Sequence, residues 1–175
     1  MAFHPNDRIV HPRHGAGTLT GIRTVERDGE TCRYYCIKLV DDQSTVMIPD
    51  DYINDAGLRL ALTDTDMINT VMSNDPQQLS DDYRSRQAQV RDLIQSGEPR
   101  QIICALRDLC WYEVNNRLNT TDTRLKLQAQ KLIASELAVK AALDFDTALE
   151  RLERIVKLAM KAHQTVQQAA ADNAQ

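Results

Sequence analysis

The spacing of apolar residues changes once along this 175-residue chain, and that change constrains the fold more than any other feature. Up to about residue 57, apolar residues alternate with polar ones, as in strands with one buried face. From about residue 62 they recur every three or four positions, as in amphipathic helices. The sequence therefore predicts an α+β fold: a β domain over residues 1–57, a helical domain over 62–165 and a frayed tail over 166–175.

Turn residues divide the β domain into five short strands. The pair Asp28-Gly29 is typical of a two-residue hairpin loop. His14-Gly15 is typical of a turn that needs a positive φ, and Pro49 ends the last strand of the series. Short strands joined by tight turns predict a small, strongly bent β-barrel of SH3 or Tudor type with an open edge.

Helix start and stop signals punctuate the second half of the chain. Asn74-Asp75-Pro76 interrupts the periodic pattern, Gly97 stops the next segment, and Pro99 suits the first turn of the helix after it. The helices are expected to begin near residues 63, 80, 99, 120 and 144. Each has one apolar face, which predicts an all-α helical bundle.

Charge limits how the chain meets nucleic acid. The formal net charge is −4, which argues against a protein that coats nucleic acid through charge alone. Residues 81–131 are the basic stretch, with nine Lys or Arg against seven Asp or Glu. Any DNA contact is therefore expected to be local, to involve few phosphates and to need the help of another protein.

Targeting segments are not evident. The first residues lack the apolar core of a signal peptide, and no apolar run approaches the ~20 residues that a membrane span needs. A cytoplasmic protein without membrane contact is expected. Its four cysteines are then expected to be reduced.

His11, His14, Cys32 and Cys36 raise the question of a zinc site. On one strand, the two cysteines would point to the same sheet face about two pleats apart, which favours core packing. Zinc ligands more commonly lie on turns with Cys-x2-Cys spacing. Packing is therefore the preferred interpretation over zinc, and we expect neither a metal nor any other cofactor.

Catalytic patterns are also lacking. The sequence has no Ser-His-Asp order, P-loop or Gly-x-Gly-x-x-Gly run. The paired carboxylates Asp41-Asp42 and Asp50-Asp51 lie beside turns, where Asp is preferred for backbone reasons. We therefore expect a protein that is not an enzyme and has no small-molecule substrate.

Residues 6–17, Asn-Asp-Arg-Ile-Val-His-Pro-Arg-His-Gly-Ala-Gly, resemble the opening of the CarD/CdnL family of bacterial transcription regulators. The family pattern is a Gly-Asp pair, two β-branched residues and then Tyr/Leu-Pro-x-x-Gly-x-Gly/Ala. Further matching segments are Pro49, residues 57–59, 107–109, 117–118 and 135–138. The resemblance covers roughly residues 3–160, so it is more specific than any single motif.

This resemblance implies a transcription regulator that docks on the lobe of the RNA polymerase β subunit with its β domain. It places the docking side chains on the second and fourth strands, at Val25, Glu26, Arg27 and Met47. Val25 and Met47 stand where studied members carry Arg. Pairing between a strand edge and the polymerase would preserve the docking mode while these side chains vary.

The resemblance also implies that the helical domain meets the minor groove at the upstream edge of the −10 element and stabilises the open promoter complex. Tyr83 stands where family members carry a wedge tryptophan beside the opened bases. A tyrosine ring suits a minor-groove step but offers less stacking area. The implied DNA contacts are Tyr83, Arg84 and Arg86, with Arg91 and Arg124 as further candidates.

Two alternatives stay open. Trp111 and Tyr112 form a rival wedge, although adjacent aromatic residues on a helix more often divide between core and rim. The second alternative is a protein–protein adaptor that binds RNA polymerase without touching DNA. The adaptor is favoured by Met47, by Val25 and by the acidic pair Asp81-Asp82, which would oppose phosphate.

Overall fold

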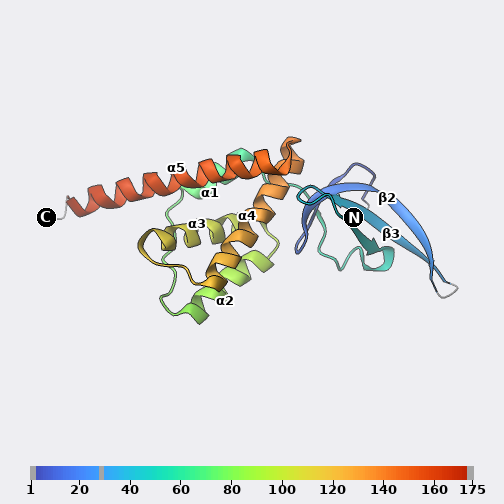
Figure 1. The fold of residues 1–175 in the computed structure, drawn as a ribbon, viewed down its shortest axis with the longest axis horizontal. Coiled ribbons are helices and arrows are strands. Elements are labelled where there is room, and N and C mark those ends of the chain that lie inside the picture. The colour runs from blue at the N-terminus through green and yellow to red at the C-terminus, as the bar shows by residue number, and fades with distance from the viewer. Residues whose placement is uncertain (1–2, 28–29, 173–175) are drawn as a thin grey trace. The chain divides into compact units, whose positions relative to one another are not determined.

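The structure, a computed structural model, describes residues 3–27 and 30–172, except the side chain of Arg27. These residues form one antiparallel sheet and five α-helices, which confirms the predicted α+β class (Figure 1). Two compact units divide the chain. The sheet unit comprises Met1–Asp64 and Lys131–Ala148, and the helix unit comprises Thr65–Gln130 and Leu149–Gln175.

The sheet has five strands in the order β4-β3-β2-β1-β5. They are β1 (Arg8–His11), β2 (Gly15–Arg27), β3 (Glu30–Leu39), β4 (Thr45–Pro49) and β5 (Arg59–Leu60), and a short 3-10 turn (Asp50–Tyr52) follows β4. Among the described residues β4 and β5 are the two edges and do not pair with each other. The described sheet does not close on itself, so the predicted barrel of SH3 or Tudor type is not confirmed.

Gly21 lies inside a long strand of this sheet. The segments on either side of Gly21 are a single strand, β2, whose pairing with β3 shifts register between Leu19 and Gly21. A glycine inside a strand commonly marks such a β-bulge, which bends the strand without ending it. The predicted turn at Asp28-Gly29 lies outside the described residues, whereas the strands on either side of it pair as a hairpin, as predicted.

The His14-Gly15 turn has the predicted backbone conformation. Gly15 adopts a φ of +90°, which only glycine adopts without strain. A Cβ atom at this position would lie 2.9 Å from the Ser135 hydroxyl, so glycine is also needed for close packing.

The helices are α1 (Thr65–Ser73), α2 (Tyr83–Gln95), α3 (Pro99–Asn115), α4 (Thr120–Ala141) and α5 (Phe145–Asp172). Their number and approximate starts agree with the apolar periodicity. Residues 166–172 continue α5, where a frayed tail was expected, because glutamine and alanine are strong helix formers. Among the described residues, no helix is long and apolar enough to cross a membrane.

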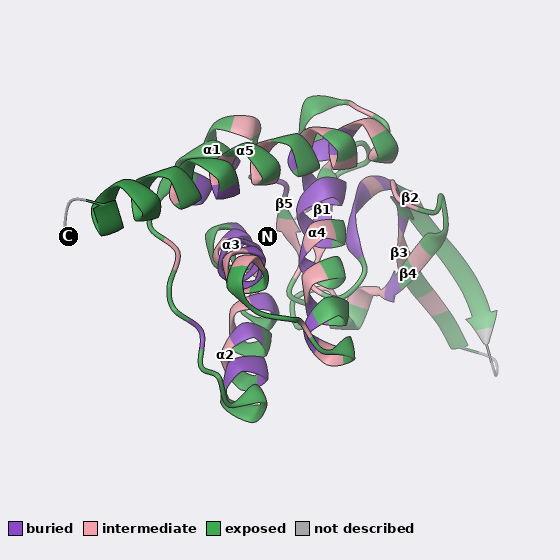
Figure 2. Ribbon diagram, turned by 60° about the vertical axis from the view of Figure 1, so that its left-hand side comes forward, coloured by how far each residue is buried: buried purple, intermediate pink, exposed green. Residues whose placement is uncertain are grey.

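The sheet unit has two apolar clusters. On one side, the core consists of residues from the strands and the N-terminal segment: Phe3, Ile9, Leu19, Ile37, Leu39 and Ile48. A smaller cluster joins Val10, Ala16 and Ala61 to Val139 of α4. Figure 2 shows buried residues along α4, and residues 132–139 in its C-terminal half are all buried. The C-terminal half of α4, predicted as part of the helical domain, therefore completes the core of the sheet unit.

Polar contacts reinforce this packing. The Ser135 hydroxyl accepts a hydrogen bond from the Ala16 N–H (3.1 Å), and Arg8 donates to the Lys140 carbonyl (2.7 Å). The Glu136 carboxylate, in a residue only 2% exposed, accepts two hydrogen bonds from the Arg59 guanidinium at 2.6 and 2.9 Å.

Glu136 also organises the chain that leaves the sheet. Its Oε1 accepts the backbone N–H groups of Leu62 (2.7 Å) and Thr63 (3.0 Å). Burial alone would raise the pKa of Glu136, but the Arg59 guanidinium and these N–H groups lower it overall. The buried carboxylate is therefore held in its charged form.

Candidate DNA-contacting and docking surfaces

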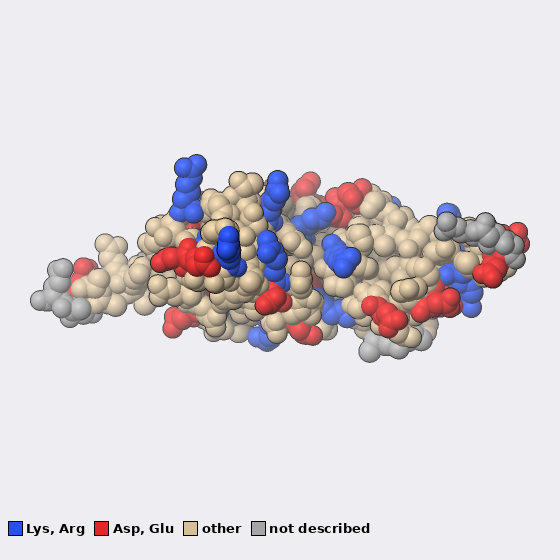
Figure 3. Space-filling view, turned by 90° about the horizontal axis from the view of Figure 1, so that it is seen from below, with Lys and Arg blue, Asp and Glu red and all other residues tan. Residues whose placement is uncertain are grey.

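Charged side chains are mixed on the face of the molecule shown in Figure 3. Lys and Arg stand among Asp and Glu without forming a continuous basic field. This distribution agrees with the expectation that any DNA contact involves few phosphates.

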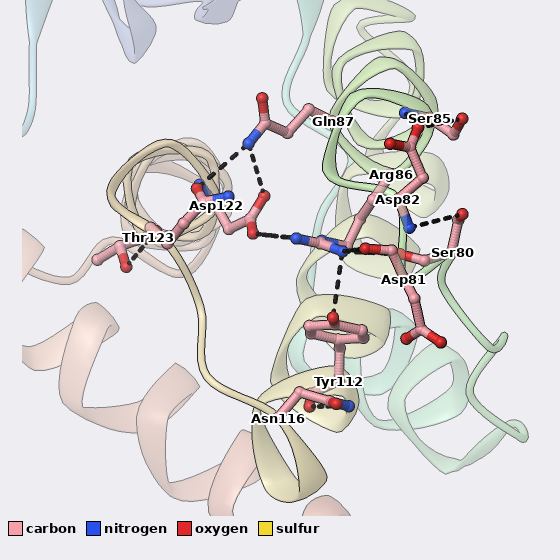
Figure 4. A network of polar contacts seen from close by, with 11 residues as sticks. Ser80, Asp81, Asp82, Ser85, Arg86, Gln87, Tyr112, Asn116, Asp122 and Thr123 are labelled. Carbon is pink, nitrogen blue, oxygen red and sulfur yellow. Dashed lines mark hydrogen bonds and ion pairs between the residues drawn. The ribbon is translucent and has the colours of Figure 1, made fainter.

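Arg86 is the centre of a buried polar network at the start of α2 (Figure 4). Its Nε and Nη2 atoms donate to Asp122 Oδ2 of α4 at 3.2 and 2.7 Å. Its Nη1 atom donates to the backbone carbonyls of Ser80 (2.7 Å) and Asp81 (3.1 Å) and to the hydroxyl of Tyr112 (3.1 Å). One guanidinium thus ties together the loop before α2, helix α3 and helix α4.

Further contacts complete the network. The Arg86 guanidinium lies 4.4 Å from the centroid of the Tyr112 ring. Gln87 donates to the second carboxylate oxygen of Asp122 (3.1 Å) and to the Asn119 side chain (3.2 Å). Burial tends to lower the pKa of Arg86, but its hydrogen bonds and charge contact with Asp122 raise it overall.

The predicted DNA contact by Arg86 does not fit this geometry. The residue is 4% exposed, Asp122 is fully buried, and the guanidinium is occupied by partners within the chain. A side chain in this state holds the local structure in place and is not available to a phosphate. Arg86 is therefore a positioning residue for the start of α2.

The first turn of α2 begins later than predicted. The helix was expected to begin near residue 80, but its N-cap is Asp82, whose carboxylate accepts the Ser85 N–H (2.9 Å) and the Ser85 hydroxyl (2.8 Å). These hydrogen bonds lower the pKa of Asp82. The acidic residue before Tyr83 thus has a capping role, and Tyr83 becomes the first residue of the helix.

Tyr83 and Arg84 are both exposed at this helix start. The Tyr83 side chain is 49% exposed, and Arg84 Nε donates to its hydroxyl at 3.1 Å. Arg91 is exposed on α2 seven residues after Arg84, on the same side two turns away, at a rise of about 10 Å. Arg124 is exposed on α4, but no described hydrogen bond or ion pair joins it to Tyr83.

Trp111 and Tyr112 of α3 are half-buried. The Trp111 ring meets the ring of His163 edge-on at 5.9 Å, and Nε2 of His163 lies 2.8 Å from the Met72 carbonyl oxygen. Tyr112 lies against Arg86. These positions agree with packing at the bundle surface, the preferred reading of this aromatic pair.

The predicted docking residues lie on the β2–β3–β4 part of the sheet. Val25 is opposite Cys32, and Cys36 is opposite Met47, so these four side chains share one face. Val25 is 37% and Met47 38% exposed. Glu26 is exposed on the other face, and the side chain of Arg27 lies outside the described residues.

The cysteines point to one face as predicted, but not into the core. Cys32 and Cys36 are half-buried on the face opposite the buried Ile37 and Leu39, because the alternation along β3 assigns the core to the odd-numbered residues. Among the described residues, no three His, Cys, Asp or Glu side chains are grouped so as to hold a metal.

His11 lies apart from these cysteines in the turn after β1. Its Nδ1 accepts the backbone N–H groups of Arg13 (3.1 Å) and His14 (3.3 Å). Burial and the neighbouring His14 and Arg13 lower its pKa. The imidazole of His11 therefore organises its own turn in the neutral form.

Comparisons with known proteins agree with the resemblance seen in the sequence. A family model described as the CarD-like/TRCF RID domain matches residues 3–60, and a model described as the CarD C-terminal domain matches residues 67–153. The putative transcription factor YdeB of Bacillus subtilis (strain 168) is 30% identical over 140 residues, which is 78% of this chain and 91% of that protein.

Proposed function

Because this chain belongs to the CarD-like family of transcription regulators, we propose that it docks on the RNA polymerase β subunit and contacts promoter DNA near the upstream edge of the −10 element. The sheet unit would supply the docking surface and the helix unit the DNA contact, which stabilises the open complex. The observation that carries the proposal is the exposed Tyr83–Arg84 pair on a helix start that the Arg86 network holds in place.

The arrangement suits a contact that depends on polymerase. Few exposed cations lie near Tyr83, so few counterions would be released from DNA and the intrinsic affinity would be low and sensitive to salt. Docking through a separate surface raises the effective concentration of the DNA-contacting residues at the promoter. The contact with polymerase and the contact with DNA, each weak alone, would then together place the protein at the promoter.

The docking surface combines a strand edge with apolar side chains. Strand β4 is an edge of the described sheet, and such an edge can pair with a strand of a partner. Met47 of β4 and Val25 of β2 lie on the same face and leave apolar area exposed. The exposed side chains of Met47 and Val25 beside the edge strand β4 support a docking mode in which a strand of the polymerase lobe pairs with β4.

We expect Met47→Glu to weaken binding to the polymerase β lobe about tenfold or more, because the new carboxylate would lose its water in the interface. Surface plasmon resonance with the isolated lobe measures this. Leu158→Glu, the same kind of change at a side chain 69% exposed on α5, is the control and should leave binding unchanged. Equal affinities for the two variants would place the docking surface elsewhere.

For the DNA contact, the double variant Tyr83→Ala with Arg84→Ala should shorten the open-complex lifetime toward its value without the protein, while polymerase binding is retained. Both residues are exposed, so the fold should be unaffected. The matched control, Arg154→Ala with Lys157→Ala, removes two exposed cations from α5 and should leave the lifetime unchanged. An unaltered lifetime in the Tyr83 and Arg84 variant would favour the adaptor without DNA contact.

A further inference from the structure

The helix unit contains a cavity that the proposed function does not use. It measures about 340 Å³ and is formed by the loop before α2, the C-terminal end of α3 and one residue of α5. Its walls combine two aromatic rings with side-chain amides: Trp111, Tyr112, Gln77, Gln78, Asn115 and Gln167. Its volume is at the lower end of the range for ligand-binding pockets.

Five of the side chains that line this cavity make no hydrogen bond within the described chain. Among the described residues, the Trp111 indole N–H and the side-chain amides of Gln77, Gln78, Asn115 and Gln167 make no hydrogen bond. The neighbouring network differs, because Arg86 and both carboxylate oxygens of Asp122 are bonded there. The cavity therefore offers several free donors beside an aromatic surface, as recognition sites do.

The charged residues that line the cavity limit the class of ligand that it can bind. Asp81 also lines the cavity. Within the described part of the chain its carboxylate makes no hydrogen bond or close ion pair, although its charge helps to raise the pKa of Arg86, which donates to the Asp81 backbone carbonyl (Figure 4). No Lys or Arg lines the described cavity. A phosphate-bearing ligand would meet the negative charge of Asp81, and the neighbouring Arg86 guanidinium is already paired with Asp122, whereas a ligand with a cationic end would be attracted to Asp81.

The secondary structure and side chains of the cavity walls limit the class of ligand further. Helices and a loop form this cavity, so no strand edge is present for an extended peptide to pair with. The many amides do not suit the apolar face of a helix. A polyproline II segment fits better, because its carbonyl groups are unbonded, proline has no N–H to satisfy, and such segments bind aromatic surfaces.

We propose that this cavity is a docking site for a proline-rich segment of a partner protein, bound as a polyproline II helix with a flanking Lys or Arg beside Asp81. The indole N–H of Trp111 and the free amides would donate to the carbonyl groups of the segment. The proline rings would pack against Trp111 and Tyr112. This activity is separate from docking on polymerase and from DNA contact.

Trp111 is the only tryptophan of the chain, so its fluorescence reports directly on the cavity. The probe is a synthetic peptide of eight prolines with two arginines at one end, titrated into the full chain. We expect a saturable change in emission. The affinity should fall about tenfold when Asn115→Ala and Gln167→Ala remove two donors, and severalfold in Asp81→Asn, which spares the backbone bond to Arg86.

A control variant separates a site from a general surface effect. Asn69→Ala with Gln164→Ala removes two exposed amides outside the cavity and should bind the peptide like the unaltered protein. The proposal is overturned if the peptide gives no saturable change or if both double variants bind equally. It is also overturned if an oligothymidine gives the saturable change instead, which would assign the cavity to unpaired bases.

Discussion

Replacing Arg86 with alanine is expected to lower the free energy of unfolding of the helix unit by about 3–5 kcal/mol. The substitution leaves the Asp122 carboxylate fully buried without its counter-ion, and it removes the donor to the Ser80 and Asp81 carbonyls. Since a typical domain is stable by about 5–15 kcal/mol, this loss would be a large fraction of the total. Urea denaturation followed by Trp111 fluorescence measures it.

Two variants serve as controls for this experiment. Arg84→Ala removes the same charge from an exposed position and should change stability by about 0.5 kcal/mol or less. Arg86→Lys keeps the charge but loses the guanidinium's fork of donors. Its loss of stability should therefore lie between those of Arg84→Ala and Arg86→Ala. If Arg86→Ala were no less stable than Arg84→Ala and lost the promoter effect, Arg86 would be a DNA contact after all.

Glu136→Ala is expected to destabilise the sheet unit by a similar amount, about 3–5 kcal/mol. The substitution removes the acceptor for two Arg59 hydrogen bonds and for the backbone N–H groups of Leu62 and Thr63. Hydrogen exchange of the β1 and β2 amides should accelerate. Exchange of the α2 and α3 amides in the helix unit serves as an internal reference, and equal acceleration in both units would contradict a local effect.

The same carboxylate gives the sheet unit a dependence on pH. The pKa of Glu136 is lower in the folded protein than its unfolded value, which is about 4.3. Its contribution to stability is therefore fully present above the unfolded value and is lost as the pH falls through the folded value. Glu136→Gln should flatten the stability curve of the sheet unit in this acidic range. Parallel curves for the two proteins would show that other groups cause the acid dependence.

Local patterns allowed the strands and helices to be predicted. Alternation identified the strands, Pro99 and Gly97 marked helix ends, and the positive φ at Gly15 followed from its place in a turn. Each of these features depends on residues close together in the sequence.

Contacts between distant residues could not be predicted in this way. Arg86 and Asp122 are 36 residues apart, and Arg59 and Glu136 are 77 apart. A single sequence does not show which cation meets which carboxylate, so Arg86 looked like an ordinary exposed arginine at a helix start. Likewise, the described sheet is open because its edge strands β4 and β5 do not pair with each other. The turn residues do not determine whether these two strands pair.

One signal in the sequence pointed to the role of α4. Residues 132–139 are apolar or small on every side of the helix except for Ser135 and Glu136, and all eight are buried. A helix that is apolar all round is expected to be buried, and a charged residue in such a run must have a partner. Glu136 can therefore be predicted to have a partner, but the sequence does not identify that partner as Arg59.

The claim that the helix unit touches promoter DNA is tested most directly by a photo-crosslinker placed at position 83 in the complex of this protein, its polymerase and a promoter. Tyr83 is exposed and aromatic, so a benzoylphenylalanine at this position preserves its character. We expect crosslinks to promoter DNA at the upstream edge of the −10 element, and only when polymerase is present. Crosslinks to polymerase alone, or DNA crosslinks of equal yield without polymerase, would contradict it.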